Sequence, residues 1–388
     1  MTFITLSGSI AIVIYLDNAS TTPLDENASK VFCEYACTNF FNPSAIYIDA
    51  LNVHKQIESA KETIAKALGT IFNDNIIITG SATEANNLAI RGAYRKNFGK
   101  MLFSIGEHPS VYNTALYLKK MGAKVEFINL QPNGEVDYAD LEAKLSSDVS
   151  FISVMLVSNE TGAINNLKRI SELKNKYCPK AIFHSDGVQA FGKIKINVDY
   201  FGVDLFTISG HKAFAPKGIG ALYVKDKNIL SPIVYGGGQE YNLRSGTENV
   251  GSIMAFKTAI ENFGNLNENY KKVQECFDAF LQQINLKDVK VNSHGSPYVL
   301  SLSFKGVNGE TLVHMMEQNN VLISRGSACS SKKAGNRILE SMGLSPEYVL
   351  GSVRISFSKY SKLQDAITAG KILNKCYIEL KDKLKWIK

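Results

Sequence analysis

The sequence predicts an α/β protein whose mostly parallel sheet carries helices on both faces, and three observations support this fold class. From about residue 75 onward, short apolar runs alternate with helical patterns. The apolar runs are continuous rather than alternating, which is typical of parallel strands buried on both faces. Polar residues capable of chemistry follow the ends of several runs, where sheets of this kind bind their ligands.

The predicted elements follow one another in the order that such a sheet requires. Strands are predicted at residues 75–79, 101–104, 124–128, 149–157, 181–184 and 203–208, and helices at 82–94, 110–121, 138–145 and 167–177. After Gly251 the pattern changes. Helices are predicted at residues 253–263, 270–284, 310–319 and 367–384, and short strands at 289–291, 299–304, 321–324 and 352–357. We therefore expect a large domain of residues 16–255 and a small α/β domain of residues 256–388 that includes residues 1–15.

The composition is that of a globular protein with a sizeable core. Of the 388 residues, 45% are hydrophobic and 20% are charged. The net charge is +7, but the lysines are scattered rather than clustered. Lys55, Lys61 and Lys66 are predicted to lie on solvated helix faces. The lack of a basic run argues against direct contact with nucleic acid.

The six cysteines and the N-terminus bear on the cellular compartment. The cysteines are sparse and lack C-x-x-C spacing, so we predict no metal site, packing of Cys33 and Cys37 in the core, and a reducing compartment. Residues 3–16 are apolar but shorter than the ~20 residues that span a bilayer. They have no basic segment or cleavage site before Asp17, so they are predicted to form a buried strand or docking arm of a cytoplasmic protein.

Lys212 lies where an amine becomes reactive. The apolar run at residues 203–208 leads directly into Ser209-Gly210-His211-Lys212. A desolvated lysine loses its proton and becomes a nucleophile, so Lys212 is a candidate for imine formation with a cofactor aldehyde.

Two segments have the features of phosphate sites. Gly80-Ser81-Ala82-Thr83-Glu84 follows a predicted strand and opens a helix, whose N-terminus suits an anion. The alternative is that Ser81 or Thr83 only caps the helix. A glycine-rich turn at residues 236–238 precedes Thr247, a second possible phosphate contact.

Three further strand ends carry His108, Asn159 and Asp186. His108 would stack on a ring or shuttle a proton, although an ordinary loop histidine is the alternative. Asn159 is followed by Glu160, and such a pair more often makes a turn. A buried Asp186 needs a cation: a pyridinium nitrogen at 4 Å would contribute about 4 kcal/mol at an effective dielectric of 20, and a structural salt bridge is the alternative.

Cys329 and Arg354 complete the set. Cys329 lies among small residues beside Arg325, Lys332 and Lys333, which favours an exposed thiolate. Arg354 lies within a strand pattern, where a buried guanidinium requires a carboxylate. Together with the residues above, these groups make up a complete pyridoxal phosphate site.

The sequence closely resembles the cysteine desulfurases of the class V aminotransferase group, which are fold type I pyridoxal phosphate enzymes. The matching segments span nearly the whole chain in family order. They are YLDNASTTP, NPS, GSATEANNLAI, EHPSV, SNETGAI, HSDGVQAFGK, SGHKAFAPKGIGALYV, GGGQEYNLRSGTENV, SRGSACSS and SVRISFS.

The resemblance implies a role for each site residue. Lys212 would be the Schiff-base lysine, with His108 stacked on the cofactor ring. Asp186 would pair with the ring nitrogen and Gln189 with the ring hydroxyl oxygen. The phosphate would be held by Ala82, Thr83, Ser209 and His211, with Thr247 reaching in from the partner subunit of a homodimer. The substrate carboxylate would bind Asn42, Asn159 and Arg354, and Cys329 would receive sulfur as a persulfide.

The implied reaction converts L-cysteine to L-alanine and passes sulfur to acceptor proteins, for iron–sulfur cluster assembly or tRNA thiolation. The alternatives are a selenocysteine lyase, another enzyme of the same fold such as an aminotransferase, or an inactive scaffold for sulfur-transfer proteins. Cys329 argues against an aminotransferase. Retention of Lys212, Asp186 and His108 argues against a scaffold. Ser20, where the family commonly has alanine, is a departure that affects the substrate pocket.

Overall fold

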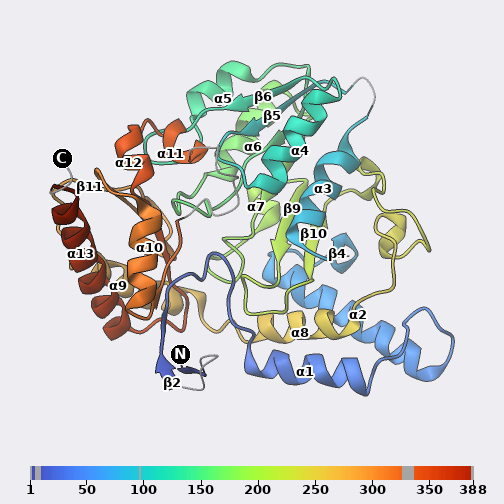
Figure 1. The fold of residues 1–388 in the computed structure, drawn as a ribbon. Coiled ribbons are helices and arrows are strands. Elements are labelled where there is room, and N and C mark those ends of the chain that lie inside the picture. Colours follow the sequence, from blue (N-terminus) through green and yellow to red (C-terminus); the bar gives the residue numbers. More distant parts are fainter. Residues whose placement is uncertain (1, 5–9, 96–97, 326–335, 386–388) are drawn as a thin grey trace.

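The computed structural model describes residues 2–4, 10–95, 98–325 and 336–385. At its centre lies a seven-stranded sheet in the order β4-β10-β9-β8-β7-β5-β6 (Figure 1). Its strands are β4 (Ile76–Thr79), β5 (Lys100–Ser104), β6 (Val125–Ile128), β7 (Val149–Ser153), β8 (Ile182–Asp186), β9 (Leu205–Ser209) and β10 (Gly220–Val224). Only β10 runs against its neighbours β4 and β9, and the other neighbouring pairs are parallel. The prediction of a mostly parallel sheet is confirmed.

Two strand predictions need correction. The run at 149–157 was predicted as one strand, but β7 ends at Ser153. Residues 154–157 stay buried yet leave the ladder, and Val157 instead forms an isolated bridge with Ile164. The antiparallel strand β10 was not predicted, because its short apolar run follows a glycine-rich turn and has no helix after it.

Helices cover both faces of the sheet, as the continuous apolar strands predict. The α3 (Ala82–Ala93) and α4 (Pro109–Lys120) helices pack on the face that carries Met101 and Phe103. The opposite face, which carries Leu102, is covered by α2 (Ile48–Ala67), α5 (Tyr138–Lys144), α6 (Leu167–Tyr177), α7 (Val198–Phe201) and α8 (Val250–Glu261). Adjacent residues of β5 therefore enter different cores.

The α1 helix (Glu26–Cys37) lies along α8 and corrects one prediction (Figure 1). Cys33 and Cys37 were expected in the core, but both are exposed. The helix turns its other face inward, where Ala28 is buried and Phe32 packs against the core. The core-packing interpretation of these cysteines is wrong.

Lys61 on α2 corrects another prediction. Lys55 and Lys66 are exposed as expected, whereas Lys61 is only 4% exposed. Its Nζ lies 3.1 Å from Glu240 Oε1, and this buried carboxylate allows a lysine to lie inside the protein. The partner is distant in the sequence, so no local pattern reveals the pair.

A second, three-stranded antiparallel sheet has the order β11-β12-β14. It is formed by β11 (Val289–Val291), β12 (Val299–Phe304) and β14 (Ser352–Ser356) and packs with α9 (Leu266–Leu281), α10 (Gly309–Gln318) and α13 (Leu363–Lys385). The short helices α11 (Arg337–Ser341) and α12 (Pro346–Leu350) form a small cluster with Leu130 at the junction with the large sheet.

The N-terminal segment packs into the core of the three-stranded sheet. The β3 strand (Ile14–Tyr15) pairs in parallel with β13 (Val321–Leu322), and Leu16 is buried in the same core. Farther toward the N-terminus, β1 (Thr2–Ile4) pairs with β2 (Ile10–Ile12). A strand was one of the two interpretations of this apolar segment, and Ile14–Tyr15 forms one. The division into residues 16–255 and 256–388 remains a prediction.

No helix among the described residues is long and apolar enough to cross a membrane.

Candidate active site

The site lies where the parallel strands of the large sheet end. The neighbouring strands β5, β7, β8 and β9 share one direction, so their carboxyl ends meet at one edge. His108 follows β5, Asn159 follows β7, and Lys212 follows β9. Asp186 is the last residue of β8. The strand topology thus gathers residues spread over more than a hundred positions.

Lys212 and two histidines share one electrostatic neighbourhood. Burial and, after it, the nearby Lys212 cation lower the pKa of His108 to about 4, although Asp186 acts in the opposite direction. The pKa of His211 is also lowered to about 4, first by burial and then by Lys212. Both imidazoles are therefore neutral at neutral pH.

Asp186 is buried, and its hydrogen bonds from the described part of the chain come from neutral groups. The Asn86 Nδ2 group donates to its Oδ2 at 2.8 Å, and the Val188 N–H donates to its Oδ1 at 3.0 Å. Among the described residues, no cationic side chain forms an ion pair with Asp186, which does not favour the structural salt-bridge interpretation. A buried carboxylate held in this way can stabilise a cation that a ligand brings.

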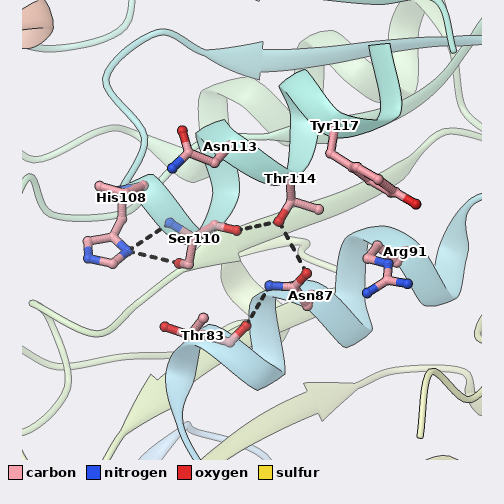
Figure 2. Close-up of a pocket in the computed structure, with 9 residues that line it drawn as sticks. Thr83, Asn87, Arg91, His108, Ser110, Asn113, Thr114 and Tyr117 are labelled. Atoms are coloured by element: carbon pink, nitrogen blue, oxygen red, sulfur yellow. Dashed lines mark hydrogen bonds between the residues drawn. The ribbon is translucent and has the colours of Figure 1, made fainter. Parts of the chain in front are cut away.

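His108 lies at the mouth of a pocket of about 620 Å³ between α3 and α4 (Figure 2). Its ring caps α4 by accepting the Ser110 N–H at Nδ1 (3.2 Å), and the Ser110 Oγ lies 2.8 Å from the same nitrogen. Thr83 lines this pocket too, whereas Ser81 is the residue that caps α3 by accepting the Glu84 N–H. Capping therefore explains Ser81 and leaves Thr83 available to a ligand.

The other phosphate candidates flank these residues. Ala82 is the first residue of α3, and Ser209 is the buried last residue of β9. The His211 carbonyl accepts the Thr22 N–H at 2.9 Å, which anchors the Lys212 turn to the N-terminal segment.

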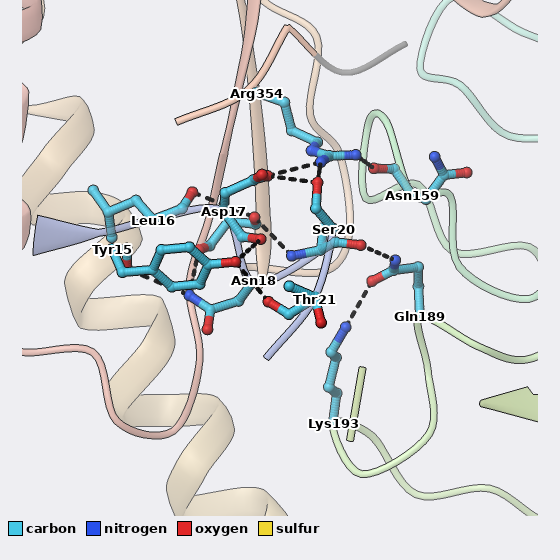
Figure 3. Close-up of polar contacts among 12 residues, drawn as sticks. Tyr15, Leu16, Asp17, Asn18, Ser20, Thr21, Asn159, Gln189, Lys193 and Arg354 are labelled. Atoms are coloured by element: carbon cyan, nitrogen blue, oxygen red, sulfur yellow. Dashed lines mark hydrogen bonds and ion pairs between the residues drawn. The ribbon is translucent and has the colours of Figure 1, made fainter. Parts of the chain in front are cut away.

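Gln189 is held in one orientation by Lys193 (Figure 3). The Lys193 Nζ donates to Gln189 Oε1 at 2.6 Å, while Gln189 Nε2 donates to the Ala19 carbonyl at 2.9 Å. Burial, together with the cations Lys212 and Arg354, lowers the pKa of Lys193 to about 7. Because the Lys193 Nζ donates to Gln189 Oε1, the amide nitrogen of Gln189 faces away from Lys193.

Arg354 is buried in β14 and binds three groups (Figure 3). One terminal nitrogen donates to Asp17 Oδ1 at 2.9 Å and to Ser20 Oγ at 2.6 Å, and the other donates to the Asn159 carbonyl at 2.9 Å. Asp17 thus provides the carboxylate that a buried arginine requires. The side-chain Oδ1 of Asn159 is buried and has no hydrogen-bond partner among the described residues.

Three predicted site residues are not part of this cluster. Asn42 is exposed, and its Oδ1 accepts the Ser44 N–H. Thr247 is exposed and lines a different pocket, beside Gly80 and Gly218. Cys329 lies outside the described residues. Their roles remain predictions.

Several residues that shape the site were not identified from the sequence. They are Asp17, Asn86, Ser110 and Lys193. All four lie inside segments that resemble the family motifs, but each acts through a contact that only the folded chain creates.

Comparisons with known proteins identify the family of this chain. Residues 14–367 match the model of the family described as Aminotransferase class-V. The cysteine desulfurase IscS of Dictyoglomus turgidum is 35% identical, covering 91% of this chain and 91% of that protein. A solved NifS-like protein has a TM-score of 0.89 at 26% identity, covering 95% of this chain and 100% of that one. The structure described as SspA in complex with cysteine has a TM-score of 0.80 at 30% identity, covering 90% and 100%. The chain belongs to the aminotransferase class-V family.

Proposed function

We propose that the protein is a pyridoxal phosphate-dependent cysteine desulfurase that converts L-cysteine to L-alanine. The observation that carries this proposal is the convergence of Lys212, His108 and Asp186 at one sheet edge, where the charges of Lys212 and Asp186 both act on His108. The similarity to a curated cysteine desulfurase over 91% of the chain supports the same activity.

The residues at this edge fit pyridoxal phosphate. Asp186 is a buried carboxylate whose donors among the described residues are neutral, which suits a protonated ring nitrogen. Lys212 Nζ would hold the aldehyde carbon, His108 would stack on the ring, and Gln189 would donate to the ring hydroxyl oxygen. The phosphate would bind Ala82, Thr83, Ser209 and His211. When bound, the cofactor supplies an electron sink that weakens bonds at the substrate's α-carbon and β-carbon.

The chain's own residues would carry out the remaining steps. Arg354 and Asn159 bind the substrate carboxylate, and the orphaned Asn159 Oδ1 is an acceptor for the substrate ammonium group. Lys212 Nζ takes the α-proton and returns a proton to the α-carbon before alanine leaves. The Cys329 thiolate forms an S–S bond to the substrate sulfur as the substrate's Cβ–S bond breaks. The electron pair of that bond stays on carbon, which takes a proton and becomes the methyl group of alanine.

The same proposal includes a homodimer that passes sulfur to acceptor proteins in the cytoplasm. Exposed apolar side chains support a second subunit: Ile46 is 93% exposed and Tyr235 is 82% exposed. Thr247 is exposed and therefore able to reach the phosphate site of a second copy. Asn42 is exposed in the same way and completes the proposed substrate-binding set.

The test is incubation of the purified protein with L-cysteine and a thiol reductant, with alanine and sulfide measured together. Lys212→Ala is expected to lose both products and the visible absorbance of the bound cofactor. Cys329→Ala is expected to keep the absorbance and lose sulfide release, because no thiolate accepts the sulfur. Cys37→Ala is the matched control, since Cys37 is an exposed cysteine on α1.

Normal turnover by Cys329→Ala would contradict the persulfide step. Unchanged absorbance of Lys212→Ala would contradict the lysine assignment. Turnover of selenocysteine but not cysteine would identify a selenocysteine lyase, and no turnover of either by the cofactor-loaded protein would favour the scaffold.

A further inference from the structure

The proton of the His108 ring is fixed by its neighbours. Nδ1 accepts the backbone N–H of Ser110 at 3.2 Å, so this nitrogen carries no proton of its own. The Ser110 Oγ lies 2.8 Å from the same Nδ1 and therefore donates its hydroxyl hydrogen to it. With Nδ1 accepting two donors, the ring proton must lie on Nε2.

A second set of contacts extends this arrangement to Asp186. The Asn86 Nδ2 group donates one hydrogen to Ser110 Oγ at 2.8 Å and the other to Asp186 Oδ2 at 2.8 Å. A carboxylate only accepts, so it determines which end of the Asn86 amide faces it. Asn86 is fully buried, and its Oδ1 has no partner among the described residues. The amide is therefore placed for its two donors, at the expense of its acceptor.

We propose that Ser110 and Asn86 are positioning residues that hold His108 as a neutral ring with its proton on Nε2 and connect that ring to the Asp186 carboxylate. The hydrogen bonds of this connection all run toward His108 from Asn86. Asn86 donates to Ser110, and Ser110 donates to His108. A proton on Nδ1 would point at the Ser110 N–H, which is itself a donor. It would also force the Ser110 hydroxyl to turn its hydrogen away from the ring.

The surroundings of His108, taken together, also favour the neutral imidazole. Lys212 and Arg337 disfavour an imidazolium, Asp186 favours it, and burial is the largest effect against it. His211, another titratable group close to His108, is itself held neutral by burial and by Lys212.

Only the role of His108 in catalysis rests on the proposed function; the position of its proton does not. In a cysteine desulfurase, a neutral His108 would donate a hydrogen bond from Nε2 to substrate or cofactor, rather than act as an imidazolium acid. Its proton position is a property of the resting protein and is measured without turnover, so failure of the desulfurase assay would leave the test intact.

The experiment is ¹⁵N NMR of the histidine rings in the selectively labelled holoenzyme, with His108 assigned by His108→Gln. In the wild type, Nδ1 is expected to have an acceptor-type shift and Nε2 a protonated-type shift, unchanged from about pH 5 to 8. Ser110→Ala keeps the backbone N–H that the His108 cap needs, and removes only the hydroxyl. It is expected to shift the Nδ1 resonance and to raise the His108 titration by about one pH unit, because Nδ1 then accepts only the longer bond from the backbone N–H at position 110. Ser110→Thr, which keeps a hydroxyl, is expected to restore the wild-type spectrum.

The Asn86 link is tested by non-additivity. Asn86→Leu removes both donors, and its effect on His108 is expected to vanish in the Ser110→Ala background. Additive effects would overturn the link through Asn86. A protonated Nδ1 or a His108 that titrates near neutral pH in the wild type would overturn the proposal as a whole, as would a Ser110→Ala spectrum identical to wild type. Circular dichroism melting of each variant checks that it is folded.

Discussion

Two buried lysines, Lys61 and Lys193, show opposite responses to similar burial. Burial lowers the pKa of Lys61, but the Glu240 and Glu58 carboxylates outweigh it, and the pKa ends above its ordinary value. Among the described residues, no carboxylate is paired with Lys193. Burial and the cations Lys212 and Arg354 lower its pKa to about 7.

The difference shows that the partners of a buried amine, rather than its depth, determine its charge. Lys61 anchors Glu240, whose other oxygen accepts the Ile78 N–H of β4 at 2.8 Å. Glu240, Tyr241 and Asn242 all have positive φ values, a conformation that costs energy and needs such an anchor. Lys193 instead contacts Gln189 at the candidate active site, and functional sites are where amines with lowered pKa values are commonly found.

The largest effect is expected from breaking the Lys61 pair. Glu240→Gln keeps the acceptor for Ile78 but leaves a buried cation without its nearest counter-charge. We expect the free energy of unfolding to fall by about 3–5 kcal/mol in urea titrations. Glu58→Gln is the matched control: its carboxylate lies 3.6 Å from Lys61 and is 33% exposed, so a smaller loss is expected. Equal losses for the two variants would contradict the central role of Glu240.

A pH-dependent effect is expected at Lys193. Its pKa is about 7 in the folded protein and 10.5 ordinarily, so between these values the unfolded chain binds a proton that the folded chain does not. The free energy of unfolding therefore rises with pH across this window, by up to about 1.4 kcal/mol per pH unit. This gain in stability is lost again as the pH falls to 7. Lys193→Met is expected to lack this rise in urea unfolding at several pH values. Parallel stability curves for the two proteins would show that Lys193 is charged when folded.

The smallest effect is expected at Lys227, which contacts the same Tyr241 ring as Lys61 but is only partly buried. Lys227 lies 4.7 Å from the centre of the Tyr241 ring and forms a surface ion pair with Asp74 at 2.9 Å. Lys227→Ala is expected to change the free energy of unfolding by no more than about 1 kcal/mol, because exposed pairs are weak. A loss comparable to that of Glu240→Gln would mean that the Tyr241 ring, and not the buried carboxylate, holds this region.

The fold could be predicted from the sequence wherever local pattern and burial coincide. Continuous apolar runs such as that of β5 predicted the parallel strands, since both faces are covered. The pattern wrongly predicted a longer strand after Ser153, where the chain stays buried but leaves the sheet. It also wrongly predicted a buried Cys33, which lies on the solvent-exposed face of its helix. Apolarity reports burial, but it does not report hydrogen-bond pairing or which helix face is turned inward.

The residues expected to react could be predicted from the sequence, but the residues that position them could not. Lys212 and Asp186 could be identified because strand ends and family motifs mark them. The supports Asn86 and Ser110 are ordinary helix residues whose meaning arises from contacts across 24 and 100 sequence positions. Ser20 was identified as a departure from the family, but its contact with Arg354 required the fold.

The N-terminal segment of residues 14–22 connects two separate parts of the molecule, the core of the three-stranded sheet and the packing around the seven-stranded sheet. Its Ile14 pairs with β13 beside the small sheet, Asp17 bridges to Ser356, and the Thr22 N–H bonds to the carbonyl next to Lys212. Loss of either core would release one end of this short stretch and disrupt the contacts at its other end. The two cores are therefore expected to melt in a single cooperative transition, with backbone amides of both protected to a similar degree in hydrogen exchange.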